Sequence, residues 1–354
     1  MLLKKPGASY VLKYDREEKK LIIVPPWHPL NMEPAESPGK DYAQVIFEGM
    51  RAVGKNLILY KPKIERLQRS IETVGLELPV SVGELDFAIR TLVGVLGETV
   101  TTPAAYIRPV VSATWEQAYG VGGQSGIPAD ATVMAWNWPK YIEDREGGLH
   151  VAMFLDESRQ HPVMAKEARN YAHGRRLRAR ADAIRKKQKI EIDEILCPGP
   201  YEVRGDVVPA DGIGEDLMLI TDKYVQVQPK DTFILGGTTR QYAISHLLPK
   251  LGLKVIEKAF TLSDLEKDGV SLSFAGNAVG ITSIGKIFVF DAKDKLVRTV
   301  KMKINSTAQK ITEQFAREIA GLVPPSGEQL LTPLNLVQGK KDRITLDRVY
   351  KEWA

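Results

Sequence analysis

The chain has 354 residues, 44% of them hydrophobic and 26% charged, and its formal net charge is +5. This length predicts two domains, and the composition is typical of a globular protein in water. A run of about 18 apolar residues and the apolar core of a signal peptide are both missing, so we expect no membrane span and no secretion. A single cysteine, Cys197, excludes an internal disulfide framework and favours a cytoplasmic location. The five histidines lack the spacing of helical metal ligands, so no metal site is expected.

Short apolar runs bounded by turn residues predict the strands of the first part of the chain. These runs lie near residues 10–14, 21–24, 43–47, 57–60, 105–112 and 131–136. Pro62 favours the start of a helix, and apolar residues follow it with helical spacing at Ile64, Leu67, Ile71 and Val74. A second helix is expected over residues 82–97.

Residues 137–148 contain proline, glycine and charged residues, which predicts a linker. The expected domains are therefore a small N-terminal domain over residues 1–136 and a larger one over residues 149–354. Residues 166–189 hold ten basic residues and two acids. This stretch predicts a solvated basic helix or, alternatively, a surface for a polyanion, but no aromatic residues are interleaved with the charges as in nucleic-acid sites.

The second half of the chain alternates strands and helices without regular βαβ spacing. Strands are expected near residues 194–196, 217–220, 224–227, 232–235, 255–259, 271–274 and 287–291, and a helix over residues 239–251. This alternation predicts a mixed α+β fold. The sequence supports no assignment for the stretch that follows Pro324.

Lys166 is the most informative residue for function. It follows a small apolar residue and stands four residues before an Asn-Tyr pair, Asn170-Tyr171. A lysine in this setting can be held out of water, as an amine must be to form an imine with a carbonyl cofactor. An arginine on an upstream helix and several glycine-rich turns downstream strengthen this interpretation.

The motifs together resemble the class IV (fold-type IV) pyridoxal-phosphate enzymes, and branched-chain amino acid aminotransferases most of all. The resemblance extends from about residue 42 to residue 287. Its pieces are Val45-Ile-Phe-Glu-Gly-Met-Arg51, Ile64-Glu-Arg-Leu-Gln-Arg-Ser70, Ala105-Tyr-Ile-Arg-Pro109, Lys166 with Asn170-Tyr171, Asp211-Gly-Ile-Gly-Glu-Asp216, Gly237-Thr-Thr-Arg240 and Gly276-Asn-Ala278. It implies a two-domain α+β fold, with a small N-terminal α/β domain and a larger, barrel-like C-terminal domain.

The resemblance implies a role for each residue of a pyridoxal 5′-phosphate site. Lys166 matches the imine lysine, which also carries the proton during catalysis. The phosphate would be held by four residues: Arg66, Thr238, Thr239 and Asn277. Tyr171 matches the residue that contacts the phenolic oxygen, and Asp211 matches the one that contacts the pyridine nitrogen.

The resemblance also implies a substrate pocket. Its residues are Tyr42, Phe47, Tyr106, Arg108, Trp138, Tyr141 and Ala278. For the aromatic members, core packing is the alternative. Arg108 lies two residues from Tyr106, hence on the same strand face, and can hold a second carboxylate or form an ion pair within the sheet.

Several positions depart from the family pattern. The family places glutamate beside the pyridine nitrogen, where this chain has Asp211, and threonine in its last loop, where this chain has Asn277. Glu167-Ala168-Arg169 replaces the small residues that usually precede the Asn-Tyr pair. Phosphate binding rests on backbone donors and should survive these changes, whereas substrate choice is open.

The expected function is transamination of hydrophobic, branched-chain L-amino acids with 2-oxoglutarate as amino acceptor. The alternatives are a D-amino acid transaminase or an aminodeoxychorismate lyase of the same fold, or a non-catalytic homologue that binds pyridoxal phosphate or an anion. The expected partners are small amino acids and keto acids, not nucleic acid or membrane. The resemblance also implies a homodimer, with the turn at residues 119–123 as a candidate for a loop that crosses between subunits.

Overall fold

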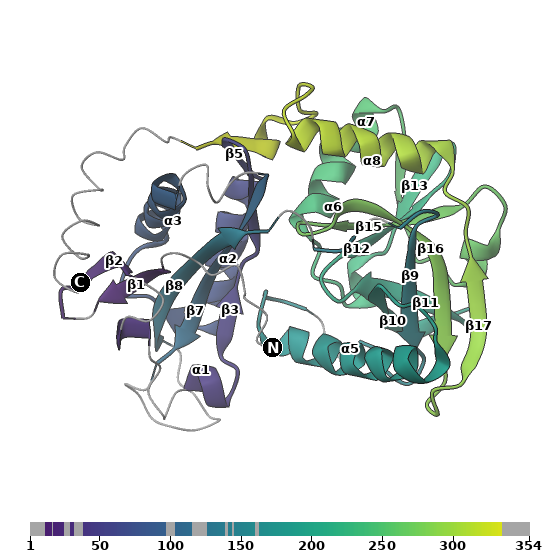
Figure 1. Cartoon of the computed structure of the whole chain (residues 1–354), viewed down its shortest axis with the longest axis horizontal. Coiled ribbons are helices and arrows are strands. Elements are labelled where there is room, and N and C mark those ends of the chain that lie inside the picture. Colours follow the sequence, from purple (N-terminus) through teal and green to yellow (C-terminus); the bar gives the residue numbers. More distant parts are fainter. Residues whose placement is uncertain are drawn as a thin grey trace. The chain divides into compact units, whose positions relative to one another are not determined.

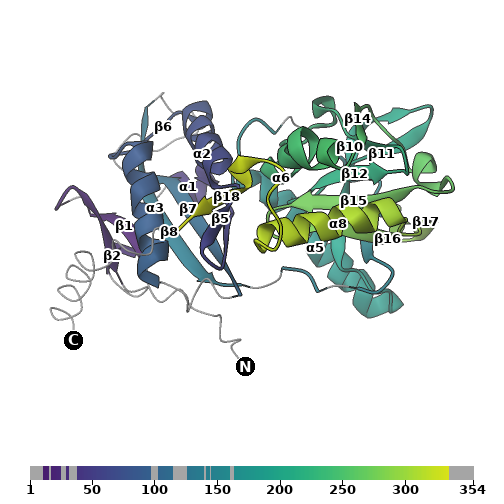
Figure 2. The same ribbon diagram turned by 90° about the horizontal axis from the view of Figure 1, so that it is seen from above.

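The structure is a computed structural model that describes residues 11–15, 17–24, 29–31, 38–96, 103–114, 126–138, 141–143, 145–159 and 163–334. The chain divides into two compact units, drawn in Figures 1 and 2. Residues 1–139, 165–169 and 331–354 belong to the first unit, and residues 140–164 and 170–330 belong to the second. The mixed α/β architecture confirms the predicted fold class.

The first unit is built on a mostly antiparallel sheet in the order β18-β5-β4-β7-β8-β1-β2, with β3 beside β7 and β6 beside β8. Its strands are β1 (Val11–Asp15), β2 (Lys20–Val24), β3 (Val45–Phe47), β4 (Met50–Val53), β5 (Asn56–Ile58), β6 (Leu76–Glu77), β7 (Ala104–Ala113), β8 (Ile127–Asn137) and β18 (Leu331–Pro333). Its helices are η1 (Pro29–Asn31), α1 (Pro38–Asp41), α2 (Tyr60–Val74) and α3 (Val82–Leu96).

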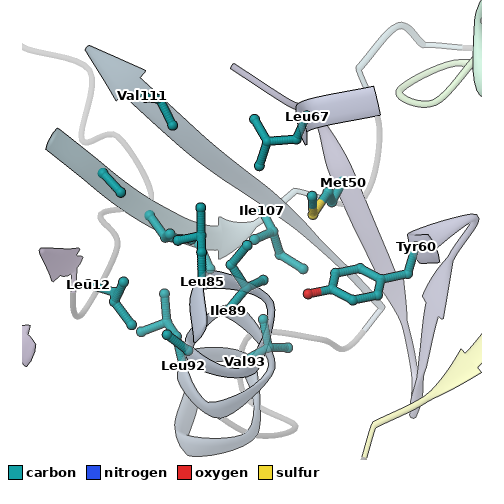
Figure 3. Close-up of a cluster of buried hydrophobic side chains, with 14 of the residues drawn as sticks. Leu12, Met50, Tyr60, Leu67, Leu85, Ile89, Leu92, Val93, Ile107 and Val111 are labelled. Atoms are coloured by element: carbon teal, nitrogen blue, oxygen red, sulfur yellow. The ribbon is translucent and has the colours of Figure 1, made fainter. Parts of the chain in front are cut away.

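The core of the first unit lies between this sheet and the helices α2 and α3. Leu85, Ile89 and Leu92 of α3 are fully buried because they recur at the helical period on one face of the helix. They pack with Ile107 and Val111 of β7 in the same cluster (Figure 3). Each fully buried aliphatic side chain of this kind contributes about 1.5–3 kcal/mol.

The second unit is built on a mixed sheet in the order β11-β10-β9-β16-β15-β12-β13-β14, with β17 beside β16. Its strands are β9 (Leu149–Phe154), β10 (Glu194–Val203), β11 (Asp206–Gly212), β12 (Asp216–Ile220), β13 (Tyr224–Val227), β14 (Lys254–Glu257), β15 (Ser271–Gly276), β16 (Gly280–Phe290) and β17 (Leu296–Lys301). Its helical segments are α5 (Arg169–Gln188), η2 (Lys230–Thr232), α6 (Thr238–Tyr242), the π-helical η3 (Ala243–Leu247), α7 (Leu248–Lys250), η4 (Ser263–Glu266), α8 (Ser306–Ile319) and η5 (Glu328–Leu330). Figure 1 shows α5 and α8 on opposite sides of this unit.

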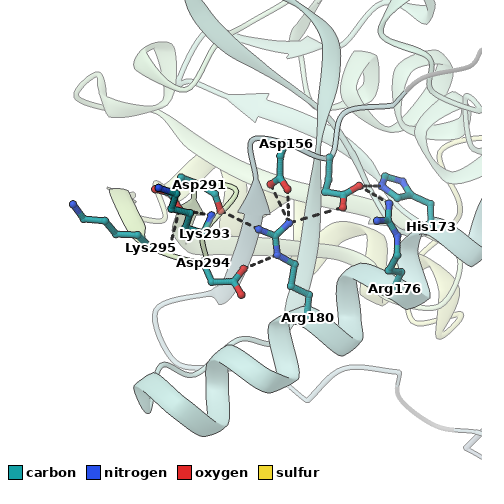
Figure 4. A network of polar contacts seen from close by, with 9 residues as sticks. Asp156, His173, Arg176, Arg180, Asp291, Lys293, Asp294 and Lys295 are labelled. Atoms are coloured by element: carbon teal, nitrogen blue, oxygen red, sulfur yellow. Dashed lines mark hydrogen bonds and ion pairs between the residues drawn. The ribbon is translucent and has the colours of Figure 1, made fainter.

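The basic helix α5 is tied to its own unit by ion pairs. Arg180 donates to Asp156 at 2.9 Å and to Asp294 at 2.6 Å, as Figure 4 shows. Arg176 pairs with Glu157 in the same network. Buried Leu177 and its helical neighbours pack on the sheet beside these charges. These contacts give several of the basic residues a structural role and favour the interpretation of a solvated helix over that of a polyanion surface.

Most predicted elements are confirmed, and one is wrong. Residues 232–235 do not form a strand, because the chain turns at Phe233, whose φ of 65° is left-handed. Its N–H donates to the carbonyl of Lys230 at 3.0 Å and thereby closes the short helix η2. Among the elements that sequence reasoning missed are α1, β4, β6, β9, β11, β17, α8 and β18.

The predicted domain boundaries stay a prediction, although the compact units have a more interleaved membership. The step from the first unit to the second, between residues 139 and 140, lies inside the expected linker. Residues 165–169 and 331–354 belong to the first unit, although the sequence-based division placed them in the large domain. The reason is strand pairing: Ile46 bridges Glu167, and β18 pairs with β5.

Candidate active site

Backbone hydrogen bonds fix the position of Lys166 along the edge of β3. The Lys166 carbonyl accepts from the Phe47 N–H at 3.1 Å, and the Lys166 N–H donates to the hydroxyl of Ser70 on α2 at 3.1 Å. The Ala168 N–H donates to Val45 at 2.8 Å, which extends the pairing by another residue. The Lys166 amine lies over the Phe47 ring, with Nζ 5.1 Å from the ring centroid. The backbone on both sides of this lysine is thus anchored, as a catalytic side chain requires.

Glu48 and Arg66 form a buried, bidentate ion pair in the same unit. Nε and Nη2 of Arg66 lie 2.6 Å and 2.8 Å from the two carboxylate oxygens of Glu48. The Glu48 side chain is fully buried and that of Arg66 is 11% exposed. Two parallel charge-assisted bonds orient the guanidinium plane, so Arg66 is held in one direction.

Arg108 of β7 lies among aromatic side chains. Its Cζ atom is 5.3 Å from the ring centroid of Phe47, 5.1 Å from that of Tyr106 and 5.7 Å from that of Trp136. Nη2 donates to the Tyr106 hydroxyl at 3.2 Å. Buried Nε of Arg108 has no acceptor among the described residues. A cation with an unsatisfied donor in apolar surroundings is suited to binding an anionic group.

The aromatic wall extends along β8 and depends on one glycine. Tyr106 contacts Trp136 and Trp138, with ring centroids 5.0 Å and 5.1 Å apart. The Tyr106 hydroxyl lies where a side chain on Gly49 would be, because a Cβ there would be 2.4 Å from it. The glycine of the Phe-Glu-Gly motif therefore makes room for the tyrosine of the Tyr-Ile-Arg motif.

In the second unit, Asp211 at the end of β11 pairs with Arg159. Nε and Nη2 of Arg159 lie 3.0 Å and 3.1 Å from the two carboxylate oxygens of Asp211. Burial raises the pKa of the Asp211 carboxyl to about 7, and the Arg159 guanidinium acts against this shift. Tyr171 of α5 lies close enough to Arg159 to act on its charge. Asp211, Arg159 and Tyr171 thus form one polar group.

The glycine turn before α6 is capped by a carboxylate. The Gly237 N–H donates to Oδ2 of Asp216 at 2.8 Å, and a Cβ on Gly237 would be 2.3 Å from that oxygen. Thr238 and Thr239 follow as the first residues of the helix, where backbone N–H groups have no intrahelical acceptor. Asn277 and Ala278 lie in the turn between β15 and β16, in the same unit.

The structure brings the predicted residues together in two groups, one in each unit. The first unit holds Lys166, Arg66, Phe47, Tyr106, Arg108 and Trp138, together with Tyr42, which is 40% exposed beyond α1. The second unit holds Tyr141, Tyr171, Asp211, Thr238, Thr239, Asn277 and Ala278. Within that second unit, Tyr141 lies near the carboxylates of Glu194 and Glu215. The candidate crossing loop at residues 119–123 lies outside the described residues.

Sequence reasoning missed four charged residues of these groups. Lys63 is fully buried on α2, and its spacing from Leu67 and Ser70 places it on the inward face of that helix. Glu48 stands inside the Phe-Glu-Gly motif, which was a usable signal. Asp216 ends the Asp211-Gly-Ile-Gly-Glu-Asp216 motif, whereas Arg159 carried no such signal because its partner Asp211 is 52 residues away.

The Amino-transferase class IV family model matches residues 45–197. This segment includes Phe47, Glu48, Arg66 and Arg108, and it contains Lys166 with the anchored backbone described above. Over this segment the chain is similar to the class IV aminotransferases, whose members use pyridoxal phosphate.

Branched-chain aminotransferases are among the proteins that this chain resembles. A probable branched-chain-amino-acid aminotransferase of Rickettsia bellii is 24% identical over 288 residues, which cover 79% of this chain and 88% of the relative. The branched-chain aminotransferase from the thermophilic archaeon Thermoproteus uzoniensis, solved with norvaline, shares the fold, with a TM-score of 0.70, 24% identity and coverage of 93% of this chain and 100% of that one. The PLP form of the branched-chain enzyme from Thermobaculum terrenum also shares it, with a TM-score of 0.72, 18% identity and coverage of 94% and 100%.

The residues of this chain fit pyridoxal phosphate. The first unit provides an amine, Lys166, and a buried guanidinium, Arg66, that is oriented by Glu48. The second unit provides a buried carboxylate, Asp211, whose charge is supported by Arg159, and the helix start at Thr238. An amine, an anion-binding cation and a carboxylate are the donor set that this cofactor requires.

Proposed function

We propose that this chain is an aminotransferase that transfers the amino group of hydrophobic, branched-chain L-amino acids to 2-oxoglutarate. The observation that supports this most is the arrangement around Phe47, because the Lys166 amine and the Arg108 guanidinium both lie over its ring. The reacting amine is thus held beside an apolar aromatic surface that also contains one cation. Such a surface can receive an aliphatic side chain and, in the other half-reaction, a second carboxylate.

Arg108 explains how one pocket can accept both substrates. An aliphatic side chain packs against Phe47 and Tyr106, while the guanidinium remains satisfied in part by the Tyr106 hydroxyl and the aromatic faces. The distal carboxylate of glutamate or 2-oxoglutarate supplies the acceptor that buried Nε lacks among the described residues. The surroundings of this one arginine support the proposed pair of substrates.

The residues proposed to hold the cofactor divide by the group they contact. Arg66 and the backbone at Thr238 and Thr239 would hold the phosphate, with Asn277 in the last loop. Tyr171 would donate to the phenolic oxygen, and Asp211 would keep a proton on the pyridine nitrogen. When bound, pyridoxal phosphate supplies the electron sink that makes the α-proton of the amino acid acidic.

Lys166 moves the proton in both half-reactions. Its amine accepts the α-proton of the donor amino acid and later delivers a proton to the α-carbon of the product amino acid. Phe47 beneath the amine excludes water from one side, and the backbone bonds to Phe47 and Ser70 keep the side chain directed there. Asp211 acts at a distance by supporting the charge of the ring nitrogen, and Arg159 keeps the Asp211 carboxylate oriented.

Half-reactions of the purified holoenzyme test the substrate. Absorbance near 410–430 nm, the usual range of lysine-bound pyridoxal phosphate, should bleach on addition of L-leucine, L-isoleucine, L-valine or L-glutamate. Bleaching by D-amino acids alone would indicate a D-amino acid transaminase, and pyruvate release from aminodeoxychorismate would indicate the lyase. A spectrum that no amino acid changes would indicate a non-catalytic binder.

Arg108→Met tests the carboxylate role separately. The variant should lose at least tenfold in kcat/KM for glutamate and 2-oxoglutarate, because their distal carboxylate loses its partner, and less than threefold for leucine. Arg90→Met, on the exposed side of α3, is the matched control and should change neither value. Equal losses for leucine and glutamate would contradict a carboxylate-binding role for Arg108.

The cellular setting and assembly are proposals as well. No helix in the described part of the chain is long and apolar enough to cross a membrane. We propose a cytoplasmic homodimer whose domains follow the boundaries expected from the sequence, and the molecular mass in solution, near 79 kDa for two chains of 39.3 kDa, would test the dimer.

A further inference from the structure

Trp136 of β8 lies beside the proposed substrate pocket, and the proposed function does not use it. It stands directly opposite Tyr106 of β7 in the antiparallel pairing of the two strands. Directly opposed residues present their side chains on the same face of a sheet, and Arg108 shares that face because it lies two residues from Tyr106. The ring centroids of Trp136 and Tyr106 are 5.0 Å apart. Strand register and ring packing therefore fix the indole beside the arginine.

Three aromatic rings from three strands surround the Arg108 guanidinium. Its Cζ atom lies 5.3 Å from the ring centroid of Phe47 on β3, 5.1 Å from that of Tyr106 on β7 and 5.7 Å from that of Trp136 on β8. Its one hydrogen bond among the described residues joins Nη2 to the Tyr106 hydroxyl at 3.2 Å, and buried Nε has no acceptor there. Of the aromatic rings, indole attracts a cation most strongly. Ring faces therefore contribute much of the stabilisation of this charge.

We propose that Trp136 is a specificity-determining residue, which stabilises the Arg108 guanidinium when the bound substrate is aliphatic. This inference rests on the proposed function, in which one pocket accepts both aliphatic and acidic substrates. An aliphatic side chain shields the guanidinium from water and offers it no counter-charge, so the charge depends on the ring faces. The second carboxylate of an acidic substrate supplies the counter-charge itself and makes the indole dispensable. Trp136 therefore favours aliphatic over acidic substrates.

The other two rings have contacts that distinguish their roles from that of Trp136. The Lys166 amine lies over Phe47, 5.1 Å from its ring centroid, so a change at Phe47 also disturbs the reacting amine. Tyr106 holds Arg108 through its hydroxyl as well as through its ring. Trp136 presents a ring face to the guanidinium and lies on the neighbouring strand. A substitution at Trp136 should therefore change the choice of substrate more than the chemical step.

Steady-state kinetics of the holoenzyme with L-leucine and L-glutamate test this role. Trp136→Leu should lower kcat/KM for leucine about fivefold, which is within the range of a cation–π contact, and kcat/KM for glutamate less than about twofold. Trp136→Phe keeps an aromatic face and should hold the ratio of the two values within about twofold of wild type. Phe87→Leu, at an exposed position of α3, is the matched control and should leave both values unchanged. An unchanged ratio in Trp136→Leu would overturn the proposal.

The Arg108→Met background separates the effect of charge from that of pocket shape. If Trp136 acts through the guanidinium, adding Trp136→Leu to this background should change the ratio of the two kcat/KM values less than about twofold. The same fivefold shift with and without the guanidinium would also overturn the proposal, because the shape of the pocket would then account for it.

A second measurement does not depend on whether Trp136→Leu folds. The chain has five tryptophans, and replacing them with tryptophan that carries increasing numbers of fluorine atoms weakens the negative ring face with little change of shape. In wild type, kcat/KM for leucine should fall stepwise with fluorine number, whereas Trp136→Phe should not respond. An equal response in the two proteins would overturn the role of Trp136. Wild-type holoenzyme that uses neither leucine nor glutamate would refute the proposed function, on which this inference rests.

Discussion

Glu48→Gln should lower the free energy of unfolding of the apoenzyme by about 2–4 kcal/mol. The two oxygens of Glu48 each accept one N–H of Arg66, at 2.6 Å and 2.8 Å, and the glutamate is fully buried. Glutamine preserves the shape and one acceptor but turns an NH₂ group toward the second N–H of Arg66. Losing one charge-assisted hydrogen bond costs about 1.5–3 kcal/mol, and removing a partner from a buried pair costs about 3–5 kcal/mol. Because one bond remains, we expect a value between these limits.

Urea unfolding followed by fluorescence measures this change, since Trp136 and Trp138 lie in the same unit as the pair. Glu65→Gln removes the same charge from an exposed position one residue before Arg66 and is the matched control. The variant should also bind pyridoxal phosphate more weakly, because Arg66 loses its fixed orientation, whereas pyridoxal without phosphate should bind as before. Unfolding free energies of Glu48→Gln and Glu65→Gln within about 0.5 kcal/mol of each other would refute the reasoning, since surface substitutions usually stay within that range.

Three further predictions concern carboxylates and the lysine. Lys166→Ala should remove transamination while the fold remains, and turnover above a tenth of wild type would contradict the proposed role of this amine. Asp211→Asn should keep the cofactor bound but slow single-turnover α-proton removal more than tenfold, because an amide cannot support the charge on the ring nitrogen; a change within threefold would leave Asp211 only a structural role. Burial raises the pKa of Asp206, but hydrogen bonds from Ser263 and Arg298 outweigh it and lower the pKa from 3.8 to about 2. This carboxylate therefore stabilises the fold above pH 4 and loses that effect as the pH falls toward 2. Asp206→Asn should lower the free energy of unfolding by about 1 kcal/mol at pH 7, a value already reduced for the partial solvation of this group. Urea titrations at pH 2 should show no difference between the variant and the wild type.

The strands and helices that sequence reasoning predicted share a local pattern. The stripe at Ile64, Leu67 and Ile71 predicted α2, because helical spacing is visible within about two turns of chain. The missed strands β9 and β11 had no such signature. Buried β9 lies between β10 and β16, and a strand covered on both faces shows no alternation of apolar and polar residues. Its identity depends on neighbours more than 40 residues away.

Some residues of the candidate site could likewise be predicted from the sequence, and others could not. Lys166, Arg66 and Arg108 stand in short motifs and could be proposed from spacing, as could Tyr106 on the same strand face as Arg108. Their partners could not be, because Arg159 is 52 residues from Asp211 along the chain. Folding alone brings these two together. Local patterns thus indicate which side chains do chemistry, whereas the partners that set their charge and direction come from tertiary structure.

Tertiary contacts of Asp211 and of its neighbour Asp216 bear on how this chain departs from the family pattern. The Asp211 side chain is one methylene shorter than that of the usual glutamate. Arg159 donates to both of its carboxylate oxygens and so holds the carboxylate in one orientation, which compensates for the shorter side chain. Asp216 supplies an acceptor for the Gly237 N–H at the start of α6, where a negative side chain is stabilised by the helix dipole.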